Sequence, residues 1–215
     1  MFQRGRDDVL RAEALAAFAW LEHGFGTRLS VGWPSNQRVA KAKQIHSDRV
    51  LLVSTDGPQG EGDGLISQVP GIGLTIRTAD CLPILIADPR HRAIAAVHAG
   101  WRGVVCEITS KTVDAMTQHF GSRPEDLVVA IGPGIGVCCF EVGPEVAVRF
   151  GSSGRTKIDL VETTCRQLRR NGVLPAQIHA CGLCSCCNRE LFESYRRDRD
   201  ASGRMTAMIA VAGDN

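Results

Sequence analysis

The sequence has few aromatic residues and no strong charge of either sign. Of its 215 residues, 5% are Phe, Trp or Tyr, and only one is a tyrosine. The 25 Lys and Arg residues are nearly balanced by 23 Asp and Glu residues, which leaves a formal net charge of +2. Single-stranded nucleic acids are bound by aromatic platforms in basic grooves, and anionic membrane surfaces attract basic segments. We therefore expect neither nucleic acid nor a membrane as a partner.

Long hydrophobic runs are also missing. No apolar stretch approaches the roughly 20 residues with which a helix crosses a bilayer. Residues 1–8 mix charges and have no apolar segment typical of a secretory signal peptide. We expect a cytoplasmic monomer. In that reducing compartment the nine cysteines serve metal binding, catalysis or packing rather than a disulfide framework.

The pattern of apolar residues predicts one α+β domain that spans residues 1–215. The chain contains no repeat, low-complexity segment or linker, and its 44% apolar content is typical of a globular protein. Helices are predicted over 7–22, 101–120, 144–150 and 158–171, and a Gly-rich loop over 56–64. Strands are predicted over 49–54, 71–77, 82–87, 92–98, 127–131, near 178 and over 205–211. Tight turns join the central strands, which favours a mixed, largely antiparallel sheet.

One predicted hairpin contains the residues of most chemical interest. The turn signal Asp88-Pro89-Arg90-His91 separates strands 82–87 and 92–98. In the simplest register for this turn, Ala87 faces Arg92.

That register places Cys81 directly across from His98, with Cβ atoms about 5 Å apart on one face. A thiol and an imidazole at this distance can bind one metal ion or act as nucleophile and base. Pro83 could introduce a bulge that shifts the register by one residue and puts the two side chains on opposite faces. A role in packing at the strand ends is the alternative.

His46, in the segment Gln44-Ile45-His46, is a candidate third ligand. Together, His46, Cys81 and His98 would form a site with two histidines and one cysteine. Three protein ligands leave one tetrahedral position open, as in catalytic zinc sites. Zinc would then lower the pKa of a bound water to about 7.

Further candidates flank this site. Asp80 is either a proton carrier or a carboxylate that caps a turn. Gly100, Arg102 and Gly103 begin a predicted helix, whose free N–H groups and guanidinium can bind phosphate or a carboxylate. The alternative is an ordinary strand-to-helix turn. Arg28 is either a second anion-binding residue or a surface arginine.

The other cysteines form two groups. Cys181, Cys184, Cys186 and Cys187 lie within seven residues, without the second, separate ligand pair of a zinc ribbon. We expect buried thiols there, with a structural metal site as the alternative. Folding could bring the adjacent pair Cys138-Cys139 close to them, although nothing in the sequence requires it.

Several segments together resemble the bacterial YfiH/YlmD-type proteins, described as multicopper polyphenol oxidase or laccase-domain proteins. The most specific are Thr78-Ala79-Asp80-Cys81-Leu82-Pro83 and Val97-His98-Ala99-Gly100-Trp101-Arg102-Gly103. The other matching segments, in family order along the chain, are His23–Arg28, Gln44–His46, Gly62–Ile66, Ile131–Gly136, Ser194–Asp198 and Gly203–Met205.

The resemblance implies an α/β/β/α-layered fold akin to cysteine hydrolases, and a zinc site formed by His46, Cys81 and His98. It also implies phosphorolysis of purine nucleosides (adenosine, inosine, guanosine or methylthioadenosine) to the base and ribose 1-phosphate or its methylthio analogue. Deamination of adenosine to inosine is implied as a side activity. Arg28 would bind phosphate or substrate.

Three other functions remain open. Cys81 and His98 could form a metal-free thiol hydrolase acting on amide bonds, for instance in peptidoglycan precursors. The protein could be a non-catalytic binding protein with structural zinc. A copper-dependent polyphenol oxidase agrees less well with the sequence, because it would need a further copper cluster. The four histidines outside the triad (His23, His91, His119 and His179) are scattered along the sequence. Copper could still occupy the triad in place of zinc, because Cu²⁺ generally binds such ligands more tightly.

Overall fold

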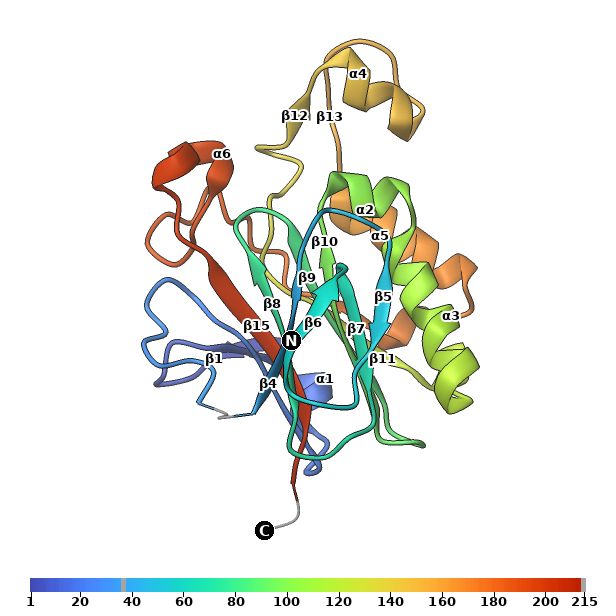
Figure 1. Cartoon of the computed structure of the whole chain (residues 1–215). Coiled ribbons are helices and arrows are strands. Elements are labelled where there is room, and N and C mark those ends of the chain that lie inside the picture. Colours follow the sequence, from blue (N-terminus) through green and yellow to red (C-terminus); the bar gives the residue numbers. More distant parts are fainter. Residues whose placement is uncertain (36–37, 214–215) are drawn as a thin grey trace.

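Two mixed β-sheets pack face to face, and helices cover the outer face of one sheet (Figure 1). The computed structural model describes residues 1–35 and 38–213. The seven-stranded sheet has the order β1 (Phe2–Arg4), β2 (Leu10–Ala12), β3 (Leu21–Phe25), β15 (Met205–Val211), β8 (Gly73–Thr78), β4 (Val39–Lys43) and β6 (Gly57–Glu61). The six-stranded sheet has the order β14 (Ile178–Ala180), β11 (Val128–Ile131), β9 (Leu82–Asp88), β10 (Ala93–Ala99), β7 (Gly64–Ser67) and β5 (Val50–Leu52).

The remaining elements are short apart from two helices. The helices are α1 (Glu13–Ala16), α2 (Trp101–Val105), α3 (Ile108–Phe120), α4 (Pro144–Ala147), α5 (Leu160–Arg170) and α6 (Tyr195–Asp198). A separate two-stranded ribbon pairs β12 (Glu141–Val142) with β13 (Thr156–Lys157). Single 3₁₀ turns span Pro124–Asp126, Val148–Phe150, Pro175–Gln177 and Arg199–Ala201.

The central strands of the six-stranded sheet are buried on both faces. In β9, Ile84 and Ile86 belong to the core beneath helices α3 and α5, whereas Leu85 and Ala87 belong to the core between the sheets. Successive side chains of a strand point to opposite faces. A strand covered on both sides therefore reads as a continuous apolar run, which is why β9, β10 and β11 are easily recognised in the sequence.

The architecture confirms the prediction of an α+β fold with layered, mixed sheets. Most strand pairs are antiparallel, whereas β4–β6, β4–β8, β5–β7 and β11–β14 are parallel. None of the helices in the described residues has the length and apolar character needed to span a membrane.

The predicted helix over 7–22 is wrong. Strand β2 occupies residues 10–12, α1 is a single turn, and β3 begins at Leu21. Val9, Leu10, Ala12 and Leu15 are buried, and two of them, Leu10 and Ala12, lie in β2, which pairs with β1 and β3. Because this apolar spacing fits either element, long-range pairing decides between them.

Two further predictions need correction. The helix expected over 101–120 is divided into α2 and α3, because Glu107 between them has a left-handed backbone with φ of 59°. The segment 56–64, expected as a loop, contains β6, which pairs in parallel with β4.

The register predicted for the central hairpin is also wrong. His98 pairs with Pro83, and Ala93 pairs with Asp88, so Cys81 lies before the strand rather than opposite His98. The Asp88 carboxylate accepts hydrogen bonds from the amides of Arg90 and His91, at 2.8 and 3.2 Å. These bonds make Asp88 the last residue of its strand and move the turn by one position. Pairing shifts by two residues, which preserves the face on which each side chain lies.

His23 in β3 is a buried histidine outside the candidate site. Its side chain is 3% exposed, and its Nε2 atom accepts a hydrogen bond of 3.0 Å from the amide of Ala12. Burial and the nearby charge of Arg11 lower the pKa of His23 from 6.5 to about 4. The ring is therefore neutral in the folded protein at neutral pH.

Because the unfolded chain takes up a proton at His23 below about pH 6.5 and the folded chain does so only near pH 4, acidification favours unfolding. We predict that His23 accounts for a loss of about 2 kcal/mol in the free energy of unfolding between pH 7 and pH 5. Denaturant titrations of the wild type and His23→Gln at both pH values measure how steeply the free energy of unfolding falls between pH 7 and pH 5. This dependence on pH should be weaker in His23→Gln. The exposed His119→Gln variant is the control and should keep the wild-type slope. Equal slopes for His23→Gln and the wild type would contradict the assignment.

Candidate metal centre and its cavity

The candidate site forms where the chain passes from one sheet to the other. Three connections leave neighbouring strands of the seven-stranded sheet and enter the six-stranded sheet: β4 to β5, β6 to β7 and β8 to β9. These connections are residues 44–49, 62–63 and 79–81, and they contain His46, Asp63 and Cys81, respectively. His98, near the end of β10, is the fourth member of the group.

Two of these connections contain a non-glycine residue with left-handed backbone geometry. The φ angle is 59° at His46 and 85° at Asp80. Such conformations cost of order 1 kcal/mol or more and persist where surrounding contacts hold them. Here they turn the chain sharply between the sheets and direct His46 and Cys81 toward His98.

His46, Cys81 and His98 lie close enough to bind one metal ion. Their nitrogen and sulfur atoms all lie within 4.8 Å of one another, and the His46 Nε2 atom is 3.9 Å from the Cys81 sulfur. Exposure increases across the group, since His98 is buried, Cys81 is partly buried and His46 is exposed. The predicted triad therefore converges, and one side of it is accessible.

Asp63 organises this group. Its carboxylate accepts a 2.7 Å hydrogen bond from the Nδ1 atom of the His98 ring. It also accepts bonds from the amides of Ile45, His46 and Ser47 and from the Ser47 hydroxyl, at 2.6–3.3 Å. A carboxylate bound to one imidazole nitrogen leaves the other free as a ligand, which is the usual arrangement around histidine-bound metals.

The charges at the site match these contacts. Although burial opposes it, hydrogen bonds from His98 and Ser47 lower the pKa of Asp63 to about 2. Burial likewise opposes ionisation of Cys81, but hydrogen bonds from His46 and His98 lower the pKa of the thiol to about 7. Asp63 and Cys81 raise the pKa of His98 to about 9 against the effect of burial. The site therefore stabilises a thiolate beside positive charge, whether that charge is a proton or a metal ion.

Gly100 packs against two of the candidate ligands, and Gly103 packs against the backbone and apolar groups beside them. A Cβ atom at Gly100 would lie 2.9 Å from the Cys81 sulfur and 2.9 Å from the His46 ring, too close for either to keep its position. A Cβ atom at Gly103 would lie 3.1 Å from Ile108 and 3.4 Å from the carbonyl of Ser47. Both glycines thus permit close packing around the triad. The five-residue helix α2 that begins here is much shorter than the predicted helix.

The triad opens into a cavity of about 750 Å³, which is within the usual size range of small-molecule sites. Its aromatic lining residues are Trp101, Phe140 and the protein's only tyrosine, Tyr195. Five arginines also line it, namely Arg77, Arg102, Arg196, Arg199 and Arg204. The cavity thus combines apolar rings, positive charge and metal-binding groups.

Of the two arginines selected from the sequence, only one lies at the cavity. Arg102 lines the cavity, and its guanidinium lies 4.6 Å from the ring centre of Trp101. Arg28 is not among the lining residues, and instead lies 3.5 Å from Glu193 and donates to the carbonyl of Arg189.

Asp80 also lines the cavity, but its carboxylate is already engaged. One oxygen accepts a 2.6 Å bond from the Ser185 hydroxyl, and the other accepts a 2.6 Å bond from the amide of Arg196. Of the two roles considered for Asp80, proton carrier and capping carboxylate, these contacts match the second. They connect the Cys81 loop to the segment that carries Tyr195 and Arg196.

The donor set suits zinc or copper at the triad, because both metals bind imidazole and thiolate. Of the other histidines, His23 and His91 make hydrogen bonds in the fold and His119 is exposed. Within residues 1–35 and 38–213, no further group of three histidine, cysteine or acidic ligands includes a histidine. The described residues therefore contain no second histidine site of the kind a multicopper centre requires.

The prediction of buried thiols over 181–187 is correct only for Cys184. Cys181 and Cys186 are partly buried, and Cys187 is exposed. The fold brings Cys184 and Cys187 next to Cys138 and Cys139, a proximity that the sequence only allowed.

The fold and site define a mixed α+β sandwich protein with a candidate mononuclear metal centre. Solved structures share this fold: YfiH from Bacillus licheniformis superposes with a TM-score of 0.89 at 25% identity, covering 98% of both chains. YlmD from Geobacillus stearothermophilus has a TM-score of 0.88 at 27% identity, with 99% of both chains covered.

Residues 27–212 match the family model described as multi-copper polyphenol oxidoreductase laccase, and the chain belongs to this family. A relative from Deinococcus radiodurans, named purine nucleoside phosphorylase, is 39% identical over 80% of this chain and 70% of its own length. A relative of the same name from Bacteroides thetaiotaomicron is 38% identical over 69% of this chain and 60% of its own.

Asp63→Asn tests the support of the metal centre. The substitution removes the negative charge at His98 and replaces one acceptor oxygen by a donor. We predict about a 10- to 100-fold loss in zinc affinity, measured by competition with a chromogenic chelator.

Asp88→Asn is the matched control. Asp88 is also buried and bonds its own histidine, His91, at 2.7 Å, but at the opposite end of the same hairpin. Asp88→Asn should keep the wild-type zinc affinity even if it destabilises the fold. Equal zinc affinities of Asp63→Asn and the wild type would contradict the role given to Asp63.

Proposed function

We propose that this protein cleaves purine nucleosides with phosphate. The reaction breaks the bond between the purine and C1′, and a phosphate oxygen forms the new bond to C1′, which yields the free base and ribose 1-phosphate. Adenosine, inosine, guanosine and methylthioadenosine are the proposed substrates, the last giving the methylthio analogue of ribose 1-phosphate. Hydrolytic removal of ammonia from adenosine, which gives inosine, is the proposed side reaction.

The observation that carries this proposal is the cavity, in which aromatic rings, arginines and the triad face one space. Its volume suits a ligand the size of a nucleoside plus phosphate. The names of the relatives support the same chemistry. Trp101, Phe140 and Tyr195 supply surfaces against which a flat purine can stack.

Arginine side chains would hold the phosphate. Among the described residues, no salt bridge involves Arg77, Arg102 or Arg199, so their charges are available to an anion, whereas Arg204 donates to the carbonyls of Ser202 and Gly203. A guanidinium binds phosphate through two parallel N–H donors. Arg196 is less available because it donates to the carbonyls of Cys139 and Glu141.

His46, Cys81 and His98 would hold a zinc ion, with copper as an alternative occupant. A bound metal supplies Lewis acidity at this end of the cavity. Asp63 fixes the His98 ring and the loop that carries His46, while Asp80 fixes the Arg196 segment and acts as a positioning residue.

Thiol hydrolysis is the second candidate, and the lowered pKa of Cys81 beside His98 favours it. Iodoacetamide distinguishes the two. Metal-free protein that cleaves amide bonds and is inactivated by the reagent supports the hydrolase. Stoichiometric metal at the triad, with no such hydrolysis, supports the nucleoside reaction.

The direct test is to incubate the zinc-loaded protein with each nucleoside, with and without phosphate, and to quantify products by chromatography. We expect adenine only when phosphate is present, and inosine in either case. Failure to form either product at full zinc occupancy overturns the proposal. Catechol oxidation by the copper-loaded protein would instead favour the oxidase.

His98→Ala should reduce phosphorolysis by about 100-fold or more, since it removes a metal ligand and the partner of Asp63. Initial rates at saturating substrate measure this effect. His91→Ala is the control, because His91 makes an equivalent bond to a buried aspartate away from the cavity. A comparable loss in both variants would attribute the effect to folding instead.

Arg102 and Arg28 can be compared directly. We expect Arg102→Gln to raise the KM for phosphate about tenfold or more, because it removes a charge-assisted contact. Arg28→Gln should leave this KM near the wild-type value, since Arg28 lies outside the cavity lining. The reverse order in steady-state kinetics would show that Arg28 is the phosphate ligand.

A further inference from the structure

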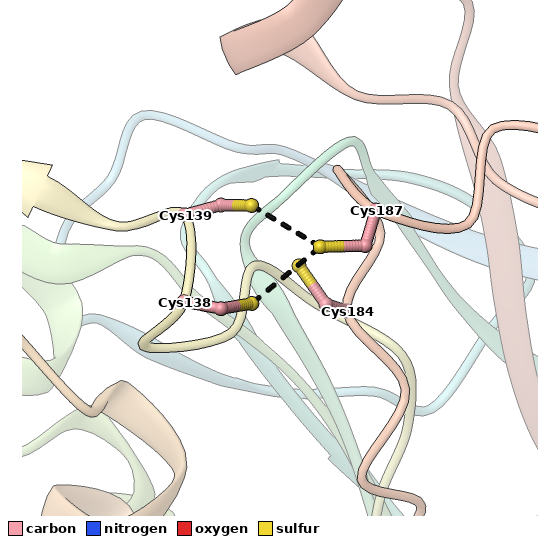
Figure 2. Close-up of side chains that lie close together, drawn as sticks. All are labelled: Cys138, Cys139, Cys184 and Cys187. Atoms are coloured by element: carbon pink, nitrogen blue, oxygen red, sulfur yellow. Dashed lines mark hydrogen bonds between the residues drawn. The ribbon is translucent and has the colours of Figure 1, made fainter.

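Four cysteines from two distant segments converge outside the triad. Cys138 and Cys139 follow β11, and Cys184 and Cys187 lie in the segment after β14 (Figure 2). A backbone bridge between Gly134 and Cys184 aligns the two segments. All four sulfur atoms lie within 4.8 Å of one another.

The separations of the sulfur atoms suit a shared metal ion. The Cys187 sulfur is 3.6 Å from that of Cys138 and 3.3 Å from that of Cys139. With zinc–sulfur bonds of about 2.3 Å, tetrahedral geometry places thiolates about 3.8 Å apart. A disulfide requires about 2.05 Å. The arrangement is therefore that of four separate thiols around one point, as Figure 2 shows.

Gly136 donates to one sulfur atom of the cluster and leaves room for two of them. The amide of Gly136 donates to the Cys184 sulfur at 3.2 Å, a contact that orients and stabilises a thiolate ligand. A Cβ atom at Gly136 would lie 3.3 Å from the Cys138 sulfur and 3.5 Å from the Cys184 sulfur. The absence of a side chain there leaves room for both.

Two arginines bind the backbone of the ligand-bearing segments, and one of them, Arg197, is also paired with the Asp198 carboxylate at 2.6 Å. Arg196 donates to the carbonyl of Cys139 at 3.2 Å. Arg197 donates to the carbonyls of Ser185 and Cys186, each at 3.1 Å. Both ligand-bearing segments are thus held in place by arginine side chains.

We propose that Cys138, Cys139, Cys184 and Cys187 form a second, structural zinc site, distinct from the triad. Four protein ligands close the coordination sphere, so this site leaves no position for a substrate. Its role is to fasten two walls of the cavity. Cys139 is followed directly by the lining residues Phe140, Glu141 and Val142, and Arg196 joins that segment to α6.

The test is to count metal ions. Protein purified under reducing conditions without chelator should contain two zinc ions per chain by plasma mass spectrometry. His46→Ala should contain one, Cys187→Ser should contain one, and the double variant should contain none. Cys187 is exposed, so serine is readily accommodated. Cys186→Ser, one residue away but outside the cluster, is the matched control and should keep two.

A spectroscopic readout covers the case in which Cys187→Ser does not fold. His46→Ala with cobalt in place of zinc should show the intense visible absorption and sulfur-to-metal charge transfer of a tetrahedral thiolate site. Cys138→Ser should weaken these bands. Chelation of His46→Ala should also lower its Tm, because a metal bound only by the folded state stabilises it.

Three results would overturn the proposal. One is a single zinc ion per wild-type chain that Cys187→Ser retains and His46→Ala loses. The second is a disulfide between Cys139 and Cys187 in reduced, freshly purified protein, detected by alkylation and mass spectrometry. The third is cobalt-loaded His46→Ala without thiolate bands. None of these measurements depends on nucleoside cleavage, so the second site stands or falls independently of the proposed function.

Discussion

The Asp63 carboxylate holds the candidate metal centre together. It lies in a two-residue connection between the sheets, is almost fully buried, and accepts hydrogen bonds from five donors. A buried charge is costly unless it is fully paired, and here the pairing is spread over the His46 loop and the His98 ring. The same interaction thus satisfies the carboxylate, offsets the strained backbone at His46 and sets the orientation of His98. Loss of the carboxylate would remove the common acceptor of all five hydrogen bonds.

The crossing of the chain between two sheets explains why residues distant in the sequence meet. A connection between stacked sheets spans about 10 Å and must bend at both ends. Left-handed residues such as His46 and Asp80 supply such bends. The three crossings leave adjacent strands of the seven-stranded sheet and place these bends at one end of the sandwich. The rigid strands β9 and β10 then place this end of the molecule reproducibly, which is what a site with narrow distance tolerances requires.

Sequence reasoning identified the triad but not the structure that supports it. Cys81 and His98 do meet, although the predicted register was wrong, because a two-residue shift preserves the face and the bend at Asp80 restores the proximity. Asp63 carried no predicted role. Two signals were available in the sequence. Asp63 stands between two glycines just before a buried strand, and a histidine that binds a metal usually has a carboxylate as its hydrogen-bond partner. Residues 7–22 were misassigned because their spacing fits both periodicities, and only the pairing partners of β2 decide between them.

The two cysteine-containing groups differ in how many ligands the chain supplies, and this difference separates their chemistry. The triad offers three side chains of increasing exposure beside a cavity. An ion bound there would keep one coordination position open to a molecule in the cavity. The Cys138–Cys187 cluster offers four thiols and leaves no such position. Hydrogen bonds nevertheless connect both groups to the walls of the same cavity. Asp80 connects the loop of Cys81 to the Arg196 segment, and Arg196 in turn bonds the carbonyl of Cys139. The wall formed by residues 140–142 is therefore connected to the candidate metal centre and to the thiol cluster through one short chain of hydrogen bonds.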